Sequence, residues 1–532
     1  MEVFKISLSR TTVCLILSAL ALAGFAILLS PRKDPQEPPF LPSSLPLVGH
    51  LIHMFGQGAG YYTDLYQQYH QGIYTLPIFR FRMYIISSPD WVSVIYKSPQ
   101  KISFNALVVP MVQKVFCMDQ RTMEIMRENM NDEKGDHSGV LHRTHDMILQ
   151  TMKPGPHLDE LNRNFLEQLT PHVNGLAKEG GTEKIKLWYW LRHHFSLASA
   201  AAIYGPENPF ALNPALEQDF WDLEASIAKL AMLPYPSVFA RKAEAGRRRM
   251  CGAMIEYAEK ERWKQASQLA KNRAEVNLGH GLSTRMYGTG EVSMLFAVLA
   301  NTVPSTFWLL SNIFADPQLL ADVRAEVGQC LRQGEDNKRI INATKVKAEC
   351  PLFFSTMKET LRMIAAMNTI RWVLEDTQVT NHNTDKTYLL KKGSMVQIAA
   401  NVIHFKSEIY GEDAATFNPR RFLPKDGKTV GDPAANFRDE KGKIHAGSFR
   451  TFGGGNNICP GRHFAQTEMQ AFVSVFVAGF EIESADGGQY VPPPIEGKKM
   501  PVAQGLIQPG RDVEVNVRRR RGYEEIEWDF EM

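Results

Sequence analysis

Apolar residues recur every three or four positions through long stretches of the chain from residue 51 onward, which is the spacing of a helix with a buried face. This pattern predicts helices over residues 156–176, 213–233, 241–272, 290–314 and 317–332. Short runs rich in β-branched and aromatic residues predict strands at 72–78, 82–88, 370–376, 387–390 and 394–400. Strands and helices do not alternate regularly, so we expect a mainly α-helical protein with small β-sheets.

The N-terminus carries an uncharged apolar run. Residues 11–30 read TTVCLILSALALAGFAILLS, and 20 helical residues would span about 30 Å, the thickness of the hydrocarbon core of a bilayer. A retained transmembrane helix is therefore predicted, although flanking lysines and arginines on both sides leave its orientation open. The alternatives are a buried core helix and a signal peptide cleaved beside Ala19, Ala21 or Ala23.

Six prolines follow between residues 31 and 46, and they predict a stiff, extended hinge. Beyond it the sequence contains no repeat and no second proline-rich linker. The predicted organisation is a membrane anchor at 1–30, a proline-rich hinge at 31–50 and one large domain at 51–532. The last residues, 518–532, combine four arginines with several acidic residues and are predicted to form a solvated tail.

The composition excludes several classes of protein. The chain has 532 residues with 60 basic and 57 acidic side chains, a formal charge of +3, whereas nucleic-acid-binding proteins usually carry a strong basic excess. Six cysteines are too few for a disulfide scaffold, and no CxxC pair indicates a zinc finger. Glycine-rich loops of the dinucleotide and phosphate-binding types are absent. A cysteine with a chemical role is therefore expected to act alone.

One cysteine stands in a distinctive segment. Residues 452–461 read FGGGNNICPG, which places Cys459 between a glycine-rich turn and a predicted helix. Pro460 suits the first turn of that helix, and the positive end of the helix dipole is expected to lower the pKa of the thiol. Glycines allow a flat ligand to approach the backbone closely. A glycine-rich turn with a single cysteine is more often structural, so this segment alone assigns no function.

Two motifs precede this loop in a fixed order. Glu359 and Arg362 stand three positions apart, as an ion pair on one helix face requires, and residues 417–422 read FNPRRF. The succession ExxR, FNPRRF and FGGGNNICPG resembles the cytochrome P450 family, the haem-thiolate oxygenases. The anchor, the hinge and the length also fit, so the resemblance covers nearly the whole chain.

The resemblance implies a cytochrome P450 fold that binds haem b. Cys459 would supply the axial thiolate and metal ligand of the haem iron, whose electron donation favours O–O cleavage. The residues implied to shape the cofactor-binding loop are Phe452, Gly453 and Gly461. The residues implied to hold the fold around this loop, without taking part in the chemistry, are Glu359, Arg362 and Arg421.

The chain departs from the family pattern at the positions that usually contact the haem propionates. Arg371 stands where the family often has a propionate-binding cation, with a surface arginine beside Glu375 as the alternative. The family's arginine or histidine two residues before the cysteine is Asn457 here, so one charge-assisted contact is lost. The family's Trp-Arg-x-x-Arg pattern is also missing. His145, together with His142, is the candidate replacement, and a solvated helix face is the alternative.

The helix predicted at 290–314 departs from the pattern as well. Where the family has an acid and an alcohol that supply protons for the reaction of dioxygen, this chain has Ala300 and Asn301. Asn301 and the adjoining Thr302 are the candidate catalytic residues, and Ala297, Ala300 and Asn301 are expected to face the substrate. Pro304 should kink the helix and free a carbonyl near residue 300. This segment resembles the branch with sterol 7α- and 12α-hydroxylases and prostacyclin synthase.

The resemblance implies a monooxygenase that oxidises a lipophilic steroid-like, terpenoid or meroterpenoid metabolite, as in specialised metabolite biosynthesis. The implied partners are O₂, an NADPH–cytochrome P450 reductase, the substrate and a membrane, with no nucleic acid. Single-pass anchoring in the endoplasmic reticulum with a cytosol-facing catalytic domain is expected. A haem-thiolate isomerase or dehydratase, which converts a peroxide without a reductase, is the main alternative because of Ala300 and Asn301. The non-enzymatic alternative is a haem-binding sensor or a membrane interaction protein.

Overall fold

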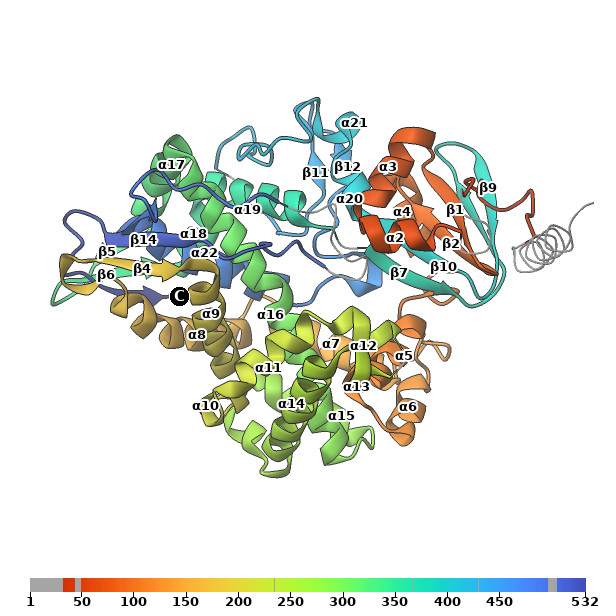
Figure 1. Cartoon of the computed structure of the whole chain (residues 1–532), viewed down its shortest axis with the longest axis horizontal. Coiled ribbons are helices and arrows are strands. Elements are labelled where there is room, and N and C mark those ends of the chain that lie inside the picture. The colour runs from red at the N-terminus through yellow and green to blue at the C-terminus, as the bar shows by residue number, and fades with distance from the viewer. Residues whose placement is uncertain (1–31, 44–48, 234, 367, 429, 496–504) are drawn as a thin grey trace, which may run out of the picture.

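The computed structural model describes residues 32–43, 49–233, 235–366, 368–428, 430–495 and 505–532. The predicted anchor at 1–30 and part of the predicted hinge lie outside these residues. Figure 1 shows helices filling the centre and the lower part of the body, with small sheets at two opposite ends. The predicted fold class, mainly α-helical with small β-sheets, is confirmed.

The long helix α16, Thr284–Ala315, runs through the centre of the body (Figure 1). Within the described residues it is the one helix long and apolar enough to cross a membrane, but 78% of its apolar window is buried inside the protein. It is therefore a core helix. The helices packed on it include α9 (Leu187–Tyr204), α14 (Arg241–Glu259), α19 (Pro351–Ile364) and α22 (Arg462–Gly479).

The remaining helices cover the outside of this core. They are α2 (Leu51–Gln57), α3 (Gly60–Tyr69), α4 (Pro89–Tyr96), α5 (Asn105–Phe116), α6 (Gln120–Arg127), α7 (Val140–Met152), α8 (Pro156–Gly175), α10 (Pro209–Leu212), α11 (Ala215–Glu224), α12 (Ile227–Met232), α13 (Pro236–Phe239), α15 (Gln268–Gly279), α17 (Pro317–Gly328), α18 (Ala343–Glu349), α20 (Ala400–Ile403) and α21 (Ser407–Tyr410).

Three of the predicted helices differ from the observed ones. The segment 213–233 is divided into α11 and α12. The segment 241–272 is divided into α14 and α15, because Glu261 takes a left-handed conformation and the Ser267 side chain caps the N-terminus of α15. The segment 317–332 is helical only as far as Gly328, after which the chain enters a strand.

The largest sheet has the strand order β1-β2-β10-β7-β3, in which the β2–β10 pair is parallel and the others are antiparallel. Its strands are β1 (Ile73–Ile78), β2 (Phe81–Ile86), β10 (Met395–Ala399), β7 (Asn368–Val373) and β3 (Ile102–Ser103). The hairpins are β8 (Thr377–Asn381) with β9 (Lys386–Leu390), and β11 (Phe437–Arg438) with β12 (Ile444–His445). Each of the five predicted strands is present, and β7 brings Arg371 into the middle of the fold.

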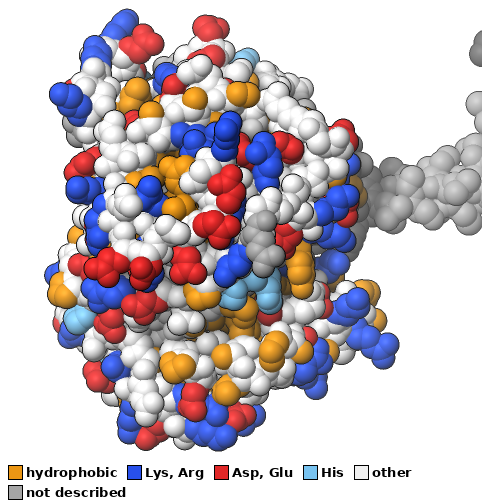
Figure 2. Space-filling view, turned by 90° about the vertical axis from the view of Figure 1, so that its left-hand side faces the viewer, with side chains coloured by type: hydrophobic (Ala, Val, Ile, Leu, Met, Phe, Trp, Pro, Cys, Tyr) orange, Lys and Arg blue, Asp and Glu red, His pale blue; other side chains and the backbone are white. Residues whose placement is uncertain are grey.

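Two three-stranded sheets lie at the other end of the body (Figure 1). One orders β13 (Phe480–Ser484), β14 (Glu514–Arg519) and β4 (Thr182–Lys186); the other orders β15 (Glu527–Glu531), β6 (Lys338–Asn342) and β5 (Leu331–Gln333). Figure 2 shows acidic and basic side chains interspersed on the face at this end. Some of these side chains form ion pairs, such as Arg332 with Glu531 at 2.7 Å. Each exposed pair of this kind contributes about 0–1 kcal/mol to the stability of the fold.

The C-terminal segment is not the solvated tail that its charges predict. Strand β15 pairs in parallel with β6, and Trp528 is only 1% exposed. The ring of Trp528 lies against Gly479, where a Cβ would come within 2.4 Å of it. Arg519 is buried too, and its guanidinium donates to main-chain carbonyls, including those of Leu176 and Ile526. The prediction was wrong because apolar residues alternate with the charges and face inward.

Candidate active site

Cys459 lies in a loop that joins the glycine-rich turn to the start of α22. The Cys459 N–H donates to the Phe452 carbonyl at 2.8 Å, so the loop closes on itself. Gly453 has a φ of 71°, a left-handed conformation that glycine adopts at little cost. A Cβ on Gly461 would lie 3.9 Å from the Cys459 Sγ, which places the sulfur beside the first turn of α22. Of the three loop residues predicted to bind the cofactor, Phe452 and Gly461 thus lie next to the cysteine, and Gly453 forms the turn that leads to it.

Burial raises the pKa of the Cys459 thiol, while the N–H groups of Gly461 and Arg462 and the positive charge of Arg462 lower it. The net direction is upward. The expectation of a lowered pKa is therefore wrong for the protein alone, because the loss of solvation outweighs the helix terminus. A metal ion at the sulfur would remove the thiol proton and so reverse this direction.

Glu359 and Arg362 form a bidentate ion pair on one face of α19. The two N–O distances are both 2.7 Å, and both side chains are fully buried. Arg421 donates to the same carboxylate at 3.1 and 3.2 Å. Arg362 also donates to the carbonyls of His404 and Ala414. None of the three charged side chains has a buried polar atom without a partner, so this network is complete in itself.

A second pair of buried arginines lies beside the Cys459 loop. Arg371 is 2% exposed and Arg450 is 5% exposed, and their guanidinium carbons lie 4.4 and 4.7 Å from the centre of the Tyr96 ring. Arg371 donates to the side-chain oxygen of Asn457 at 3.1 Å, and Arg450 donates to the Tyr96 hydroxyl. The Nε atoms of both arginines have no hydrogen-bond partner. Burial lowers the pKa of both groups.

Neither of these arginines forms an ion pair with an acidic side chain in the described part of the chain. The alternative that places Arg371 on the surface beside Glu375 does not fit, because Glu375 instead pairs with Lys101 at 2.6 Å. Two buried cations without a counter-charge are costly unless an anion joins them. The residues around the loop therefore fit a ligand that carries carboxylates, as haem does.

The histidines of α7 also fit a polar ligand group. The Nε2 atoms of His142 and His145 are buried and have no hydrogen-bond partner, whereas a solvated helix face would leave them in water. The His145 Nδ1 lies 3.8 Å from a carboxylate oxygen of Asp146. The end of α7 reaches the cysteine loop, since Met152 lies 3.7 Å from the position of a Cβ on Gly461.

The middle of α16 leaves one stripe of its surface uncovered. Phe296, Ala297 and Asn301 are partly or fully exposed, although the rest of this helical segment is buried. Ala297 and Asn301 are four residues apart and so share one helix face, and Phe296 lies directly before Ala297. Ala300, three residues after Ala297, is 6% exposed and so adds little to the uncovered surface. The stripe offers apolar surface and one amide group, that of Asn301.

The helix continues through Pro304 without a break. The hydroxyls of Ser305 and Thr306 donate to the carbonyls of Asn301 and Thr302, at 2.7 and 2.9 Å. In a regular helix the N–H of residue 304 would donate to the Ala300 carbonyl, but Pro304 has no N–H. Thr302 is buried at 7% exposure, so of the two candidate catalytic residues only Asn301 lies on the open stripe.

Sequence reasoning did not single out Arg450 or Tyr96. The residue that could have pointed to them is Gly454. Its backbone is extended, a conformation that any residue can adopt, so the absence of a side chain there indicates that a neighbouring group occupies the space. Here a Cβ on Gly454 would lie 2.5 Å from the Arg450 Nη1, and one on Gly455 would lie 3.1 Å from the Tyr96 ring. The glycine-rich turn thus makes room for an arginine as well as for a ligand.

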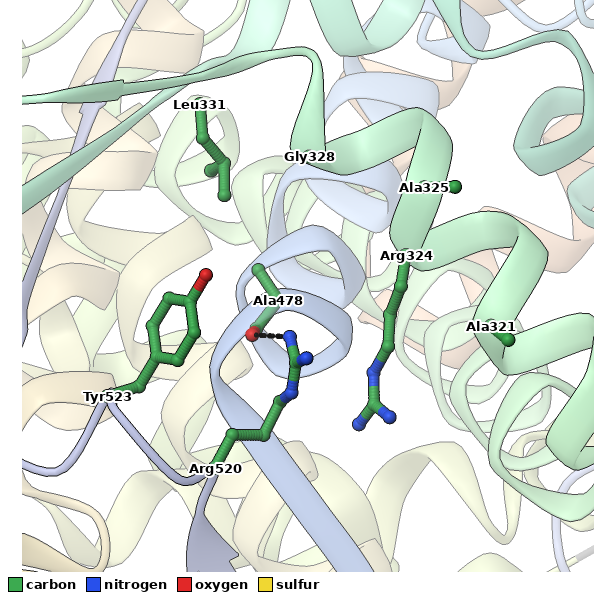
Figure 3. A pocket seen from close by; sticks show the side chains of 8 residues that line it. All are labelled: Ala321, Arg324, Ala325, Gly328, Leu331, Ala478, Arg520 and Tyr523. Atoms are coloured by element: carbon green, nitrogen blue, oxygen red, sulfur yellow. Dashed lines mark hydrogen bonds between the residues drawn. The ribbon is translucent and has the colours of Figure 1, made fainter.

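A surface cavity of about 480 Å³ lies elsewhere, near the end of α22 (Figure 3). Its arginines are already satisfied. Arg520 donates to the Ala478 carbonyl at 2.6 Å, and Arg324 donates to the Val477 carbonyl and pairs with Glu481 at 3.0 Å. These contacts stabilise the carbonyls at the C-terminal end of a helix, so the cavity offers no unpartnered arginine to a ligand. The lining residues are Ala321, Arg324, Ala325, Gly328, Leu331, Ala478, Arg520 and Tyr523.

Comparison with known proteins gives the same result as the motifs. The chain is 29% identical to a cytochrome P450 monooxygenase of Gibberella zeae over 524 residues, which cover 96% of this chain and 95% of that protein. It is 28% identical to the cytochrome P450 monooxygenase nodJ of Hypoxylon pulicicidum over 505 residues, 94% of this chain and 93% of that one.

A mammalian protein also matches. The 5-beta-cholestane-3-alpha,7-alpha-diol 12-alpha-hydroxylase of Sus scrofa is 25% identical over 520 residues, which cover 94% of this chain and 97% of that protein. The model of the family described as Cytochrome P450 matches residues 38–509. The resemblance inferred from the three motifs is confirmed across most of the sequence, and the chain belongs to the cytochrome P450 family.

Proposed function

We propose that this P450 monooxygenase binds haem b through Cys459 and oxidises a lipophilic steroid-like, terpenoid or meroterpenoid metabolite in specialised metabolism. Electrons would come from NADPH through a cytochrome P450 reductase. The observation that carries the proposal is the position of the Cys459 sulfur, which lies in a closed backbone loop at the first turn of α22. The other described cysteines differ, since Cys251, Cys330 and Cys350 are buried in the core and Cys117 is exposed.

Haem held there would supply the activation of dioxygen, and a thiolate ligand favours cleavage of the O–O bond. The chain's own residues would do the rest. Phe296 and Ala297 on the open stripe of α16 offer apolar surface to a substrate and exclude water. The Asn301 amide can donate and accept, and no hydrogen bond joins it to another described side chain, so it can hold a water or a substrate oxygen.

The carbonyl of Ala300 complements this amide. Because Pro304 cannot donate to it, it can accept a hydrogen bond from a water molecule within the helix. Neither Ala300 nor Asn301 is an acid, so a proton would have to travel through such ordered water. This is the observation that keeps a peroxide isomerase or dehydratase as the second candidate.

The substrate class rests on relatives and on the apolar stripe. The name of the Sus scrofa relative specifies a steroid diol as its substrate. A lipophilic substrate fits an apolar stripe with one amide, because apolar area supplies affinity and a single polar group supplies orientation.

Membrane anchoring in the endoplasmic reticulum is part of the proposal. It rests on the apolar run at residues 11–30 and on exposed apolar side chains around α13. Tyr235 and Val238 are 74% and 70% exposed, and Leu233 and Phe239 accompany them. Apolar side chains gathered in one short segment are typical of a surface that meets lipid or another protein.

The test of the haem ligand is spectroscopic. The reduced, CO-treated protein should show the Soret band of a thiolate-ligated haem, and Cys459→Ser should abolish it. The matched control is Cys117→Ser, which changes an exposed cysteine in the same way and should leave the band unchanged. Retention of the thiolate band in Cys459→Ser would refute the assignment.

The reaction class is tested by turnover. If the enzyme is a monooxygenase, product should form only when reductase, NADPH and O₂ are all present. Conversion of a lipid hydroperoxide without any reductant would instead favour the isomerase or dehydratase. Asn301→Leu should lower the yield of product per NADPH consumed, because the amide that orders water is removed while the side-chain volume is kept.

A further inference from the structure

We propose that Arg450, Tyr96 and Arg371 form the anion site that holds the two carboxylates of haem, with Arg450 in place of the cation that the family has at the position of Asn457. This proposal rests on the haem binding at Cys459 proposed above. It goes beyond the family motifs, because Arg450 and Tyr96 belong to none of the three motifs that carry the resemblance.

The first argument is charge. Arg371 and Arg450 are both at least nine-tenths buried, and neither has an acidic partner among the described residues. Other buried arginines are compensated: Arg362 pairs with Glu359, and Arg273 pairs with Glu291 at 2.8 Å. Arg519 has no acidic partner in the part of the chain that the structure describes, but its three nitrogens all donate to main-chain carbonyls, whereas Arg371 and Arg450 each keep a buried Nε without any acceptor. Two unpaired cations therefore match a ligand with two negative charges.

The second argument is the way the two guanidinium groups are held. Both lie over the ring of Tyr96 at the end of α4, and the Tyr96 hydroxyl accepts a hydrogen bond from Arg450. Cation–π contacts and this hydrogen bond fix the planes of both groups but leave each Nε free. Planar guanidinium groups with free donors are suited to bind carboxylates.

The third argument is the glycine-rich turn. Gly454 and Gly455 pack directly on Arg450 and Tyr96, and a Cβ at either position would press on the guanidinium or on the ring. The same turn leads within four residues to Cys459. The arginine site and the sulfur thus belong to one continuous loop structure.

The role of Asn457 completes the site. Its amide oxygen accepts a hydrogen bond from Arg371, so it orients one arginine where the family supplies a second cation. A cation at Asn457 would lie next to Arg371 and repel it. Arg450 instead brings the second positive charge, which also lies over the Tyr96 ring.

The experiment compares holoproteins. In Arg450→Met, which keeps the length of the side chain but removes its charge, the propionate bending band in the resonance Raman spectrum should shift. Haem transfer to excess apomyoglobin should become roughly 10- to 100-fold faster, the effect of losing a charge-assisted hydrogen bond. The matched control is Arg520→Met in the surface cavity of Figure 3, which should change neither readout.

An unshifted propionate band together with an unchanged rate of haem transfer in Arg450→Met would overturn the proposal. If that variant yields no holoprotein, Arg450→Lys decides: a shifted band supports the proposal, because lysine keeps the charge but loses the planar fork, and an unshifted band overturns it. Absence of the thiolate CO band in the wild-type protein would refute the haem ligand at Cys459 instead, so the two failures are distinguishable.

Discussion

Two networks of buried arginines lie close together in this fold, and they differ in one respect. Glu359, Arg362 and Arg421 contain their own anion, and each of their buried polar atoms has a partner. Arg371 and Arg450 are equally buried but have no acidic partner, and their Nε atoms are unsatisfied. A complete network has nothing left to offer a ligand, whereas an incomplete one requires a ligand.

The difference separates structural from binding residues without reference to any motif. A buried ion pair contributes little net stability, but the loss of one partner is strongly destabilising. The complete network therefore favours the one fold in which all of its partners meet. The incomplete network stores an electrostatic penalty in the protein alone, and that penalty is relieved when carboxylates arrive. We therefore expect variants of the first network to fail in folding and variants of the second to fail in haem retention.

His404 connects the two networks. Its Nδ1–H donates to the Arg362 carbonyl at 3.1 Å, and its Nε2 accepts the Arg450 N–H at 2.9 Å. Both contacts require the neutral imidazole with the proton on Nδ1. Its burial and the charges of Arg362 and Arg450 lower the pKa of His404 to about 3. The two networks are thus joined through a group that must stay uncharged.

The largest effect is expected for Glu359→Ala. This change leaves Arg362 buried without its anion and Arg421 with Asp413 alone, at a cost of about 3–5 kcal/mol, which is a large share of the stability of a typical domain. We expect little soluble protein and no CO-binding haem band in a purified sample. The matched control is Glu481→Ala, which removes a partly exposed partner of Arg324 and should cost less than about 1 kcal/mol. A haem-replete, stable Glu359→Ala variant would contradict the structural role.

The next effect is a pH dependence through His404. The folded protein keeps this histidine neutral down to about pH 3, whereas the unfolded chain binds the proton near pH 6.5. Its contribution to stability is therefore complete above pH 6.5 and is lost as the pH falls below it, by at most ~1.4 kcal/mol per pH unit. His404→Gln keeps a donor and an acceptor but does not titrate, so denaturant unfolding between pH 6.5 and 4.5 should show a shallower slope. Equal slopes in both proteins would contradict this assignment.

A smaller effect is expected for Gly454→Ala, which acts on the second network alone. The added methyl group would displace the Arg450 guanidinium, whereas the backbone at Gly454 is extended and accepts alanine. Overpacking of this kind typically costs about 1–3 kcal/mol, and we expect it to appear as faster haem loss with a nearly unchanged unfolding midpoint of the haem-free protein. The matched control is Gly252→Ala in α14, where nothing lies within 4 Å. A lower unfolding midpoint without faster haem loss would contradict the prediction.

The sequence predicted the first network and missed half of the second. ExxR and FNPRRF are local patterns, and their residues meet because a helix face and one loop bring them together. Arg450 and Tyr96 come from segments more than 350 residues apart, and their contact depends on how the largest sheet and α4 pack against the cysteine loop. Spacing along the chain carries no signal for such a contact. Only the run of glycines beside Arg450 indicated that something bulky needed room.

The fold shows the same division. The strands that became β1, β2, β7, β9 and β10 were predicted from runs of β-branched and aromatic residues, and the core helix α16 from its apolar length. β15 was not, because its pairing partner, β6, lies almost 200 residues earlier and its own charges outnumber its apolar residues. Trp528 packs against Gly479 and so holds β15 on the body of the protein, and no local sequence pattern reveals that contact.

The smallest effect, and the sharpest test of the comparison, is expected for Asn457→Asp. This change places a carboxylate where Arg371 now finds an amide oxygen at 3.1 Å, so the second network gains the anion that the first one has. The protein should then hold its own counter-charge, and a haem carboxylate arriving at Arg371 should be repelled. We expect haem transfer to apomyoglobin to become about 10-fold faster, or ~1.4 kcal/mol, while the haem-free protein becomes no less stable. Asn456→Asp, an exposed neighbour in the same loop, controls for added charge and should change neither quantity. Slower haem loss in Asn457→Asp would show that Arg371 does not need an external anion, and the distinction between the two networks would then fail.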